Sequence, residues 1–183
     1  MRKITYYVAT SLDGFISGPD GDISGFAQGG PGVDQYLQDL QSYDTVIMGR
    51  KTYEFGYAFG LQPGQPAYPH MQHYIFSNSL KFDDPHEQVK VCPLGLEIIR
   101  ELKKGEGSDI YLCGGGVFAG WLLDNELVDV LKVKLNPLVL GQGVRLFGNS
   151  LKTCRLSLSE HQGYDGGLQI LTYQIDYSGE GGV

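Results

Sequence analysis

The sequence lacks the features that mark membrane, secreted and nucleic-acid-binding proteins. No apolar run approaches the roughly 20 residues that cross a bilayer, and Met1 to Val8 pass directly into a strand-like pattern without a signal-peptide cleavage site. Only 14 Lys and Arg residues oppose 21 Asp and Glu residues, which gives a formal net charge of -7. Because a nucleic acid or an anionic membrane needs a basic patch, we expect a cytoplasmic protein that binds neither.

Cysteine, metal-ligand and nucleophile motifs are also missing. The three cysteines, Cys92, Cys113 and Cys154, form no C-x-x-C pair, so they support neither a disulfide framework nor a zinc site. We expect reduced, mostly buried thiols. The four histidines form no H-E-x-x-H set and no serine lies in a G-x-S-x-G elbow, which makes metal-dependent hydrolysis and triad chemistry poor explanations. No metal is expected.

What is present fits one globular domain over residues 1–183. Hydrophobic residues make up 42% of the chain and charged residues 19%, which is typical of a folded soluble protein. The 27 glycines fall in short clusters without a collagen-like period. They therefore indicate tight turns and places where backbone is approached closely.

Strand and helix patterns alternate along most of the chain. Short apolar or β-branched runs predict strands at 3–10, 45–48, 73–76, 89–92 and 109–113, and helical spacing predicts helices at 33–43, from 51, at 94–104 and at 117–123. Residues 18–32 and 60–69 are predicted loops. Residues 127–135 alternate in polarity, and 156–175 predict two strands joined at Asp165-Gly166-Gly167. The pattern predicts a three-layer α/β/α fold with a central mixed, mostly parallel sheet, an antiparallel C-terminal edge and a frayed tail at 178–183.

The most informative local unit is the triple glycine Gly114-Gly115-Gly116 between a buried strand and a helix. Its N–H groups can face an anion without a Cβ in the way, and the helix N-terminus adds favourable partial charge. A plain tight turn with positive φ is the alternative, but three consecutive glycines at this junction favour a phosphate site. The spacing matches neither G-x-G-x-x-G nor a P-loop.

Two other strand ends carry polar residues. Gly49-Arg50-Lys51-Thr52 closes a buried strand and opens a short helix, and ligands of open α/β sheets collect at such ends. Arg50, Lys51 and Thr52 suit a phosphate, although a solvated cationic helix start is an equally good explanation taken alone. Ser77-Asn78-Ser79 ends another strand and is also ordinary turn chemistry.

Two carboxylates are candidates for chemistry. Asp13 lies in the turn after the first strand and Asp34 near the start of the first helix. Asp13 can simply stabilise its own turn, and Asp34 can be a favourable acid at a helix N-terminus. From the residues alone these structural explanations are the stronger ones.

Several motifs, in order, resemble the dihydrofolate reductase superfamily. Two segments of this sequence resemble the cofactor segments of dihydrofolate reductases. They are Val46-Ile47-Met48-Gly49-Arg50-Lys51-Thr52-Tyr53-Glu54 and Tyr111-Leu112-Cys113-Gly114-Gly115-Gly116-Val117-Phe118. The reductase domain of riboflavin-biosynthesis proteins, in the same superfamily, is more similar to Ala9-Thr10-Ser11-Leu12-Asp13-Gly14, Leu127-Val128-Asp129-Val130-Leu131, Asn136-Pro137-Leu138-Val139-Leu140-Gly141-Gln142-Gly143 and Leu146-Phe147-Gly148. The resemblance runs from about residue 3 to 176.

The resemblance implies an NADPH-dependent oxidoreductase, with homodimerisation as a further family expectation. Gly49, Arg50, Lys51 and Thr52, with Ser77, Asn78 and Ser79, would surround the adenosine phosphate of NADPH, and Gly114, Gly115, Gly116, Val117 and Phe118 would hold its pyrophosphate. Asp13 takes the place of an active-site aspartate of the riboflavin-type domain. Asp34 takes that of the carboxylate that orients the pterin in dihydrofolate reductases.

Departures from both families concern the substrate. The segment 54–59 is aromatic where the riboflavin-type reductase carries a basic, threonine-rich stretch for ribose phosphate, and no H-x-E with P-C-x-x-C of the fused deaminase is present. Against dihydrofolate reductase, the tryptophan of the P-W pair is missing and Trp121 lies in another element. We therefore expect a small heterocyclic or ribosylamino-pyrimidine-type substrate, with dihydrofolate reduction or a non-catalytic nucleotide-binding module as alternatives.

Overall fold

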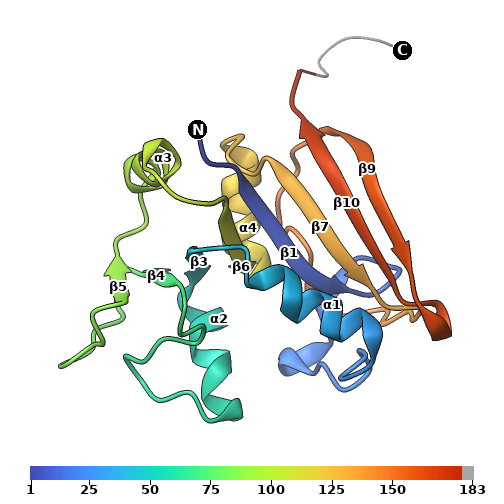
Figure 1. The fold of residues 1–183 in the computed structure, drawn as a ribbon, viewed down its shortest axis with the longest axis horizontal. Coiled ribbons are helices and arrows are strands. Elements are labelled where there is room, and N and C mark those ends of the chain that lie inside the picture. Colours follow the sequence, from blue (N-terminus) through green and yellow to red (C-terminus); the bar gives the residue numbers. More distant parts are fainter. Residues whose placement is uncertain (179–183) are drawn as a thin grey trace.

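The computed structural model describes residues 1–178, which are built around one eight-stranded sheet (Figure 1). The strand order is β5-β4-β3-β6-β1-β7-β10-β9. The strands of this sheet are β1 (Ile4–Thr10), β3 (Thr45–Gly49), β4 (Gln72–Phe76), β5 (Val89–Cys92), β6 (Ile110–Gly114), β7 (Val130–Leu135), β9 (Arg155–Gly163) and β10 (Gln169–Asp176). A second, small sheet pairs β2 (Phe15–Ser17) with β8 (Val144–Arg145).

The first six strands in this order, from β5 to β7, run parallel to their neighbours. Strand β10 is antiparallel to β7, and β9 is antiparallel to β10. This arrangement confirms the predicted mixed sheet with an antiparallel C-terminal edge. It also places the carboxyl ends of six parallel strands along one edge of the sheet, where open α/β folds bind ligands.

Helices cover both faces of the sheet and complete the three predicted layers. They are α1 (Pro31–Leu40), α2 (Arg50–Phe55), α3 (Leu96–Lys104) and α4 (Gly116–Asp124), together with the 3-10 turns η1 (Pro19–Gly21), η2 (Gly56–Phe59) and η3 (Asp165–Gly167). Side chains of α1 and α2 pack in one buried cluster, and those of α3 and α4 pack in another. No helix within residues 1–178 has the length and apolar character needed to cross a membrane.

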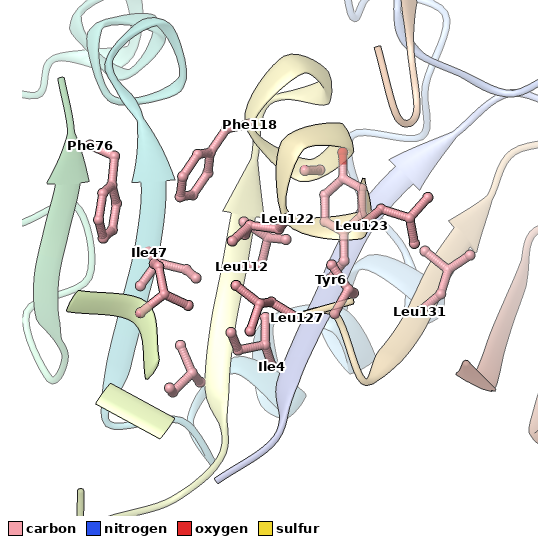
Figure 2. Close-up of a cluster of buried hydrophobic side chains, with 14 of the residues drawn as sticks. Ile4, Tyr6, Ile47, Phe76, Leu112, Phe118, Leu122, Leu123, Leu127 and Leu131 are labelled. Carbon is pink, nitrogen blue, oxygen red and sulfur yellow. The ribbon is translucent and has the colours of Figure 1, made fainter. Parts of the chain in front are cut away.

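The alternation of side chains along β1 explains how one strand serves both clusters. Ile4 and Tyr6 point to the α3 and α4 face, whereas Tyr7 points to the α1 face, because successive residues of a strand project to opposite sides. Figure 2 shows Ile4 and Tyr6 packed with Leu122 of α4 in the first cluster. The helices on the two faces of the sheet therefore pack against the same short apolar runs from which the buried strands were predicted.

Three sequence expectations need correction. Helix α1 begins at Pro31 and ends at Leu40, earlier at both ends than the predicted 33–43, because proline suits the first helical position. The small sheet of β2 and β8 was not predicted, since strands of three and two residues carry almost no periodicity. The three cysteines are free, but each is only partly buried.

The end of α3 is tied to a neighbouring strand by a lysine. Lys103 lies in the last turn of this helix, and its side chain is buried. Its Nζ lies 2.5 Å from Asp129 Oδ2 and donates a hydrogen bond to the Leu127 carbonyl at 3.3 Å. Lys103 therefore ties α3 to the chain that enters β7. Of the predicted frayed tail, 179–183 lie outside the described residues.

Candidate functional site

Three predicted cofactor segments lie next to one another at the carboxyl edge of the sheet. The segment 49–52 follows β3, 77–79 follows β4, and 114–118 follows β6. Because β3 lies between β4 and β6, these three chain ends are neighbours (Figure 1). Segments that are distant in sequence are thereby brought into one surface.

The triple glycine and the G-R-K-T segment are in direct contact. A methyl group placed on Gly115 would lie 3.0 Å from Thr52 Oγ1, and one placed on Gly49 would lie 3.4 Å from Cβ of Phe118. The first contact would be tighter than most Cβ contacts, and the second would be an ordinary van der Waals contact. The two segments are therefore packed directly against each other, with Gly115 at the tightest point.

The start of α4 presents main-chain donors at this contact. Gly115 is the N-cap residue, and Gly116, Val117 and Phe118 form the first turn, whose amides have no acceptor within the helix. Val117 is 75% exposed, whereas Gly116 and Phe118 on either side of it are buried. Free amides and the positive end of the helix dipole together favour an anion here.

The three consecutive glycines have different physical roles. Gly114 has a φ of +130°, which favours glycine, so the tight-turn alternative describes this residue correctly. A Cβ on Gly116 would meet the Arg145 carbonyl oxygen at 2.1 Å, so Gly116 is needed for chain packing. Gly115 has an ordinary φ of -88° and is the glycine whose missing side chain leaves room beside Thr52.

Arg50 connects α2 to the turn after β4. Its Nη1 donates a hydrogen bond to Ser79 Oγ at 3.0 Å, and its Nε bonds Glu54 Oε1 at 2.7 Å. Glu54 offsets the cation at this helix start, so Arg50 is not merely a solvated charge. No acceptor within residues 1–178 engages its Nη2, which leaves guanidinium donors for an anion beside Ser79.

The turn after β4 is itself well ordered by hydrogen bonds. Ser77 Oγ accepts the amides of Ser79 and Leu80, and Asn78 Oδ1 accepts the amide of Leu94. A groove of about 480 Å³ runs beside this turn, lined in part by Ser77 and Asn78. Lys81 also lines the groove. Sequence reasoning missed this cation, although it stands two residues after the S-N-S turn.

Asp13 is held by the polypeptide around it. Its Oδ1 accepts bonds from Ser11 Oγ at 2.6 Å and the Leu140 amide at 3.1 Å, and its Oδ2 accepts the Gly141 amide at 2.7 Å. The hydrogen bond from Ser11, followed by those from the two amides, lowers the pKa of Asp13 to about 2. Asp13 is therefore ionised at neutral pH and joins its own turn to residues 140–141.

Asp34 lies in the first turn of α1 and is exposed. Its carboxylate makes no hydrogen bond or ion pair with any residue in the range 1–178, and nothing in this range links it to Asp13. The helix-start explanation fits this placement. The two candidate carboxylates are thus separate features, one clamped and one free in solvent.

A cluster of hydroxyl groups and a thiol lies under α1. Tyr36 Oη of α1 and Tyr111 Oη of β6 are 2.7 Å apart, and Tyr68 Oη lies 3.6 Å from Cys113 Sγ. Burial raises the pKa of Cys113, so its thiol is protonated at neutral pH. Cys113 directly precedes Gly114, which puts this polar cluster beside the cofactor segments. Within residues 1–178 no group of three or more His, Cys, Asp or Glu side chains is arranged to hold a metal.

Strand order, the crossing helices and the paired strand-end segments define a dihydrofolate-reductase-like fold. Dihydrofolate reductase from Enterococcus faecalis, complexed with NADP(H), superposes with a TM-score of 0.65 at 18% identity, covering 94% of this chain and 96% of that one. The family assignment rests on sequence similarity. The chain belongs to the RibD C-terminal domain family, whose model matches residues 2–170.

Several other proteins resemble this chain over more than nine-tenths of its length. YwjB of Bacillus subtilis (strain 168), an uncharacterized protein, is 30% identical over 174 residues, covering 92% of this chain and 96% of its own. A protein of Shewanella sp. PV-4, described as a riboflavin biosynthesis protein, has a TM-score of 0.78 at 23% identity and covers 96% and 99% of the two chains. The Thermotoga maritima diaminohydroxyphosphoribosylaminopyrimidine deaminase/5-amino-6-(5-phosphoribosylamino)uracil reductase has a TM-score of 0.69 at 14% identity, covering 95% of this chain and 56% of that one.

Proposed function

We propose that this protein is an NADPH-dependent reductase that acts on a small heterocyclic or ribosylamino-pyrimidine-type substrate. The observation that carries the proposal is the contact between the G-R-K-T segment and the glycine segment, with Gly115 against Thr52 Oγ1. Membership of the RibD C-terminal domain family and the reductase activity named for the Thermotoga maritima protein support the same chemistry.

The residues at the sheet edge fit a phosphorylated dinucleotide. Arg50, with Thr52 and the Ser77 to Ser79 turn, would hold the adenosine phosphate, since guanidinium and hydroxyl donors converge there. The amides of the first turn of α4 would hold the pyrophosphate. When bound, NADPH supplies a hydride to the carbon of a C=N or C=O bond.

The two candidate carboxylates would have different tasks on the substrate side. Asp13 is ionised and its oxygens are largely occupied, so it suits a substrate-anchoring or loop-positioning role better than proton donation. Asp34, exposed on α1, remains the candidate for a proton source or an anchor. Both roles are part of the proposal.

A cofactor titration with a single arginine variant tests this assignment. Only NADPH carries the extra adenosine phosphate, so Arg50→Ala should raise its Kd about tenfold or more while raising the Kd of NADH less than about twofold. Binding can be followed by the fluorescence of the reduced nicotinamide. Arg100→Ala is the matched control, because Arg100 is an exposed arginine on α3, across the sheet from α1 and α2.

Two outcomes of this titration would count against the proposal. Equal losses for NADPH and NADH would remove Arg50 from the phosphate site. The absence of saturable binding of either cofactor to the wild-type protein would remove the reductase assignment altogether.

Turnover is tested separately from binding. NADPH absorbance should fall when the correct substrate is added, and the panel should contain dihydrofolate and pyrimidine ribosyl phosphates. Oxidation with dihydrofolate alone would favour dihydrofolate reduction. Saturable cofactor binding without oxidation across the panel would favour a non-catalytic nucleotide-binding module.

A further inference from the structure

A buried lysine without a counter-ion lies near the candidate site. Lys134, the next-to-last residue of β7, is only 7% exposed. It lies in register between Ala9 of β1 and Ile170 of β10. Its Nζ lies 5.2 Å from the centre of the Tyr36 ring of α1, so its side chain points to the α1 face of the sheet.

Lys132, two residues earlier on the same face of β7, provides a comparison, because its charge is neutralised by a carboxylate. Its Nζ also lies over a tyrosine ring, that of Tyr7, at 4.8 Å, but it pairs with Asp39 Oδ2 at 2.7 Å. Lys134 Nζ makes no hydrogen bond or ion pair with any residue from 1 to 178, and Asp39 is already engaged by Lys132. Two lysines of equivalent orientation thus differ in one respect, the presence of a carboxylate.

Keeping this ammonium under α1 costs folding free energy. An ammonium that is largely withdrawn from water without an anionic partner is unfavourable, and the ring of Tyr36 compensates only part of that cost. In agreement, burial lowers the pKa of Lys134, with no neighbouring charge acting in the opposite direction. A methionine would fill the same space without this cost, so the charge is best explained by a ligand.

The position of Lys134 connects it to the cofactor segments. Tyr36, whose ring it covers, shares a hydrogen bond with Tyr111 of β6, and the polar cluster continues to Cys113 beside Gly114. Strands β7, β1 and β6 are consecutive in the sheet. With neighbouring strands about 5 Å apart, the backbones of β7 and β6 are separated by on the order of 10 Å, a span that a small heterocycle with an anionic arm can bridge.

We infer that Lys134 is a substrate-anchoring residue, whose ammonium binds a phosphate or carboxylate of the substrate under α1. This inference rests on the proposed reductase function, because it assigns the anionic end of that enzyme's substrate. It also accounts for the aromatic segment 54–59, which lacks the basic residues expected to hold such a group. Lys134 of β7 would supply the cation instead.

Ligand titrations on Lys134→Met test the inference. Ribose 5-phosphate serves as the phosphate probe, ribose as the uncharged control, and 4-aminobenzoylglutamate as the carboxylate probe, each followed by calorimetry or ligand-observed NMR. We expect Lys134→Met to weaken one of the two anionic probes about tenfold or more, as the loss of a charge-assisted hydrogen bond predicts. Lys132→Met should change its affinity less than about twofold. The probe that responds identifies the anion.

Cofactor binding separates this inference from the proposed function. Lys134→Met should bind NADPH with wild-type affinity, whereas Arg50→Ala should not. If wild-type protein binds a probe through Lys134 but fails to bind NADPH, the anion site stands and the reductase assignment falls. If NADPH binds normally and Lys134→Met leaves both probes unaffected, or if only Arg50→Ala weakens them, Lys134 is not the anchor.

Stability gives a second readout that a purely structural lysine would not produce. Lys134→Met should leave Tm unchanged or raise it, because it removes an uncompensated buried charge. Lys132→Met should lower Tm by several degrees, because it leaves Asp39 without its cation. A Lys134→Met protein that is less stable than the Lys132→Met protein would overturn the inference.

Discussion

His73 provides a direct test of whether the core is packed as described. The residue lies on β4 with no exposed surface. Its Nδ1 lies 3.0 Å from the Met71 carbonyl oxygen, and its Nε2 lies 3.1 Å from the Tyr68 amide, which must donate. The neutral ring with its proton on Nδ1 satisfies both contacts, whereas a proton on Nε2 would oppose the Tyr68 N–H.

The size of the effect follows from the pKa of His73. Burial, with a smaller contribution from His70 and His86, lowers it from 6.5 to about 4. Between these values the unfolded chain binds a proton that the native protein does not, so the free energy of unfolding falls as pH decreases through this window. At about 1.4 kcal/mol per pH unit, the loss relative to pH 7 reaches about 2 kcal/mol at pH 5 and about 3 kcal/mol at pH 4.

Urea unfolding at a series of pH values measures this loss. His73→Gln, whose amide can accept from Tyr68 and donate to Met71 without titrating, should remove about 2 kcal/mol of the pH dependence between pH 7 and pH 5. His161→Gln, on the exposed strand β9, is the control and should follow the wild-type curve. If His73→Gln and the wild type lost stability in parallel, the buried neutral imidazole described here would be wrong.

Two further substitutions test the packing of α4 and the role of Asp13. Gly120→Ala should destabilise the protein by about 2 kcal/mol or more, because its Cβ would lie 2.2 Å from the Phe147 carbonyl oxygen, whereas Gly163→Ala, with open space around it, should change thermal unfolding little. Asp13→Asn should lower turnover about tenfold or more and change the Kd of NADPH less than about twofold, since only the acceptor for the Gly141 amide is lost; unaltered turnover would remove Asp13 from the mechanism.

The fold was largely predictable because its strands carry strong local signals. Short apolar runs such as 45–48 and 109–113 end in glycine or polar turns, and the order of strands and helices limits the sheet to a few topologies. The G-R-K-T and triple-glycine segments were found because strand ends of a parallel sheet must share one edge. The direct contact between Thr52 and Gly115 depends on tertiary packing, so no local sequence pattern predicts it.

The residues that escaped prediction depend on long-range pairing. The ion pair of Lys103 was not predicted, because its partner, Asp129, lies 26 positions later. Lys132 and Lys134 differ in sequence by nothing that reveals which one Asp39 neutralises. Tyr36 and Tyr111 are 75 positions apart in the sequence, and only the fold brings their hydroxyls together. Alternation places a side chain on a face but does not identify what it meets there.

The turn after β1, at residues 11–14, is hydrogen-bonded to the segment 138–146 near the other end of the chain. Main-chain bonds join Leu12 to Leu138 at 2.8 Å and Leu146 to Gly14 at 2.9 Å, and Asp13 clamps Gly141 to the same turn. The chain then continues to the Arg145 carbonyl oxygen, against which Gly116 opens α4. Because most of these links are main-chain hydrogen bonds, single side-chain changes in the S-x-D-G turn should alter the substrate side while leaving the start of α4 in place. The order of motifs along the sequence therefore reflects one continuous rim that reaches from the first strand to the proposed pyrophosphate site.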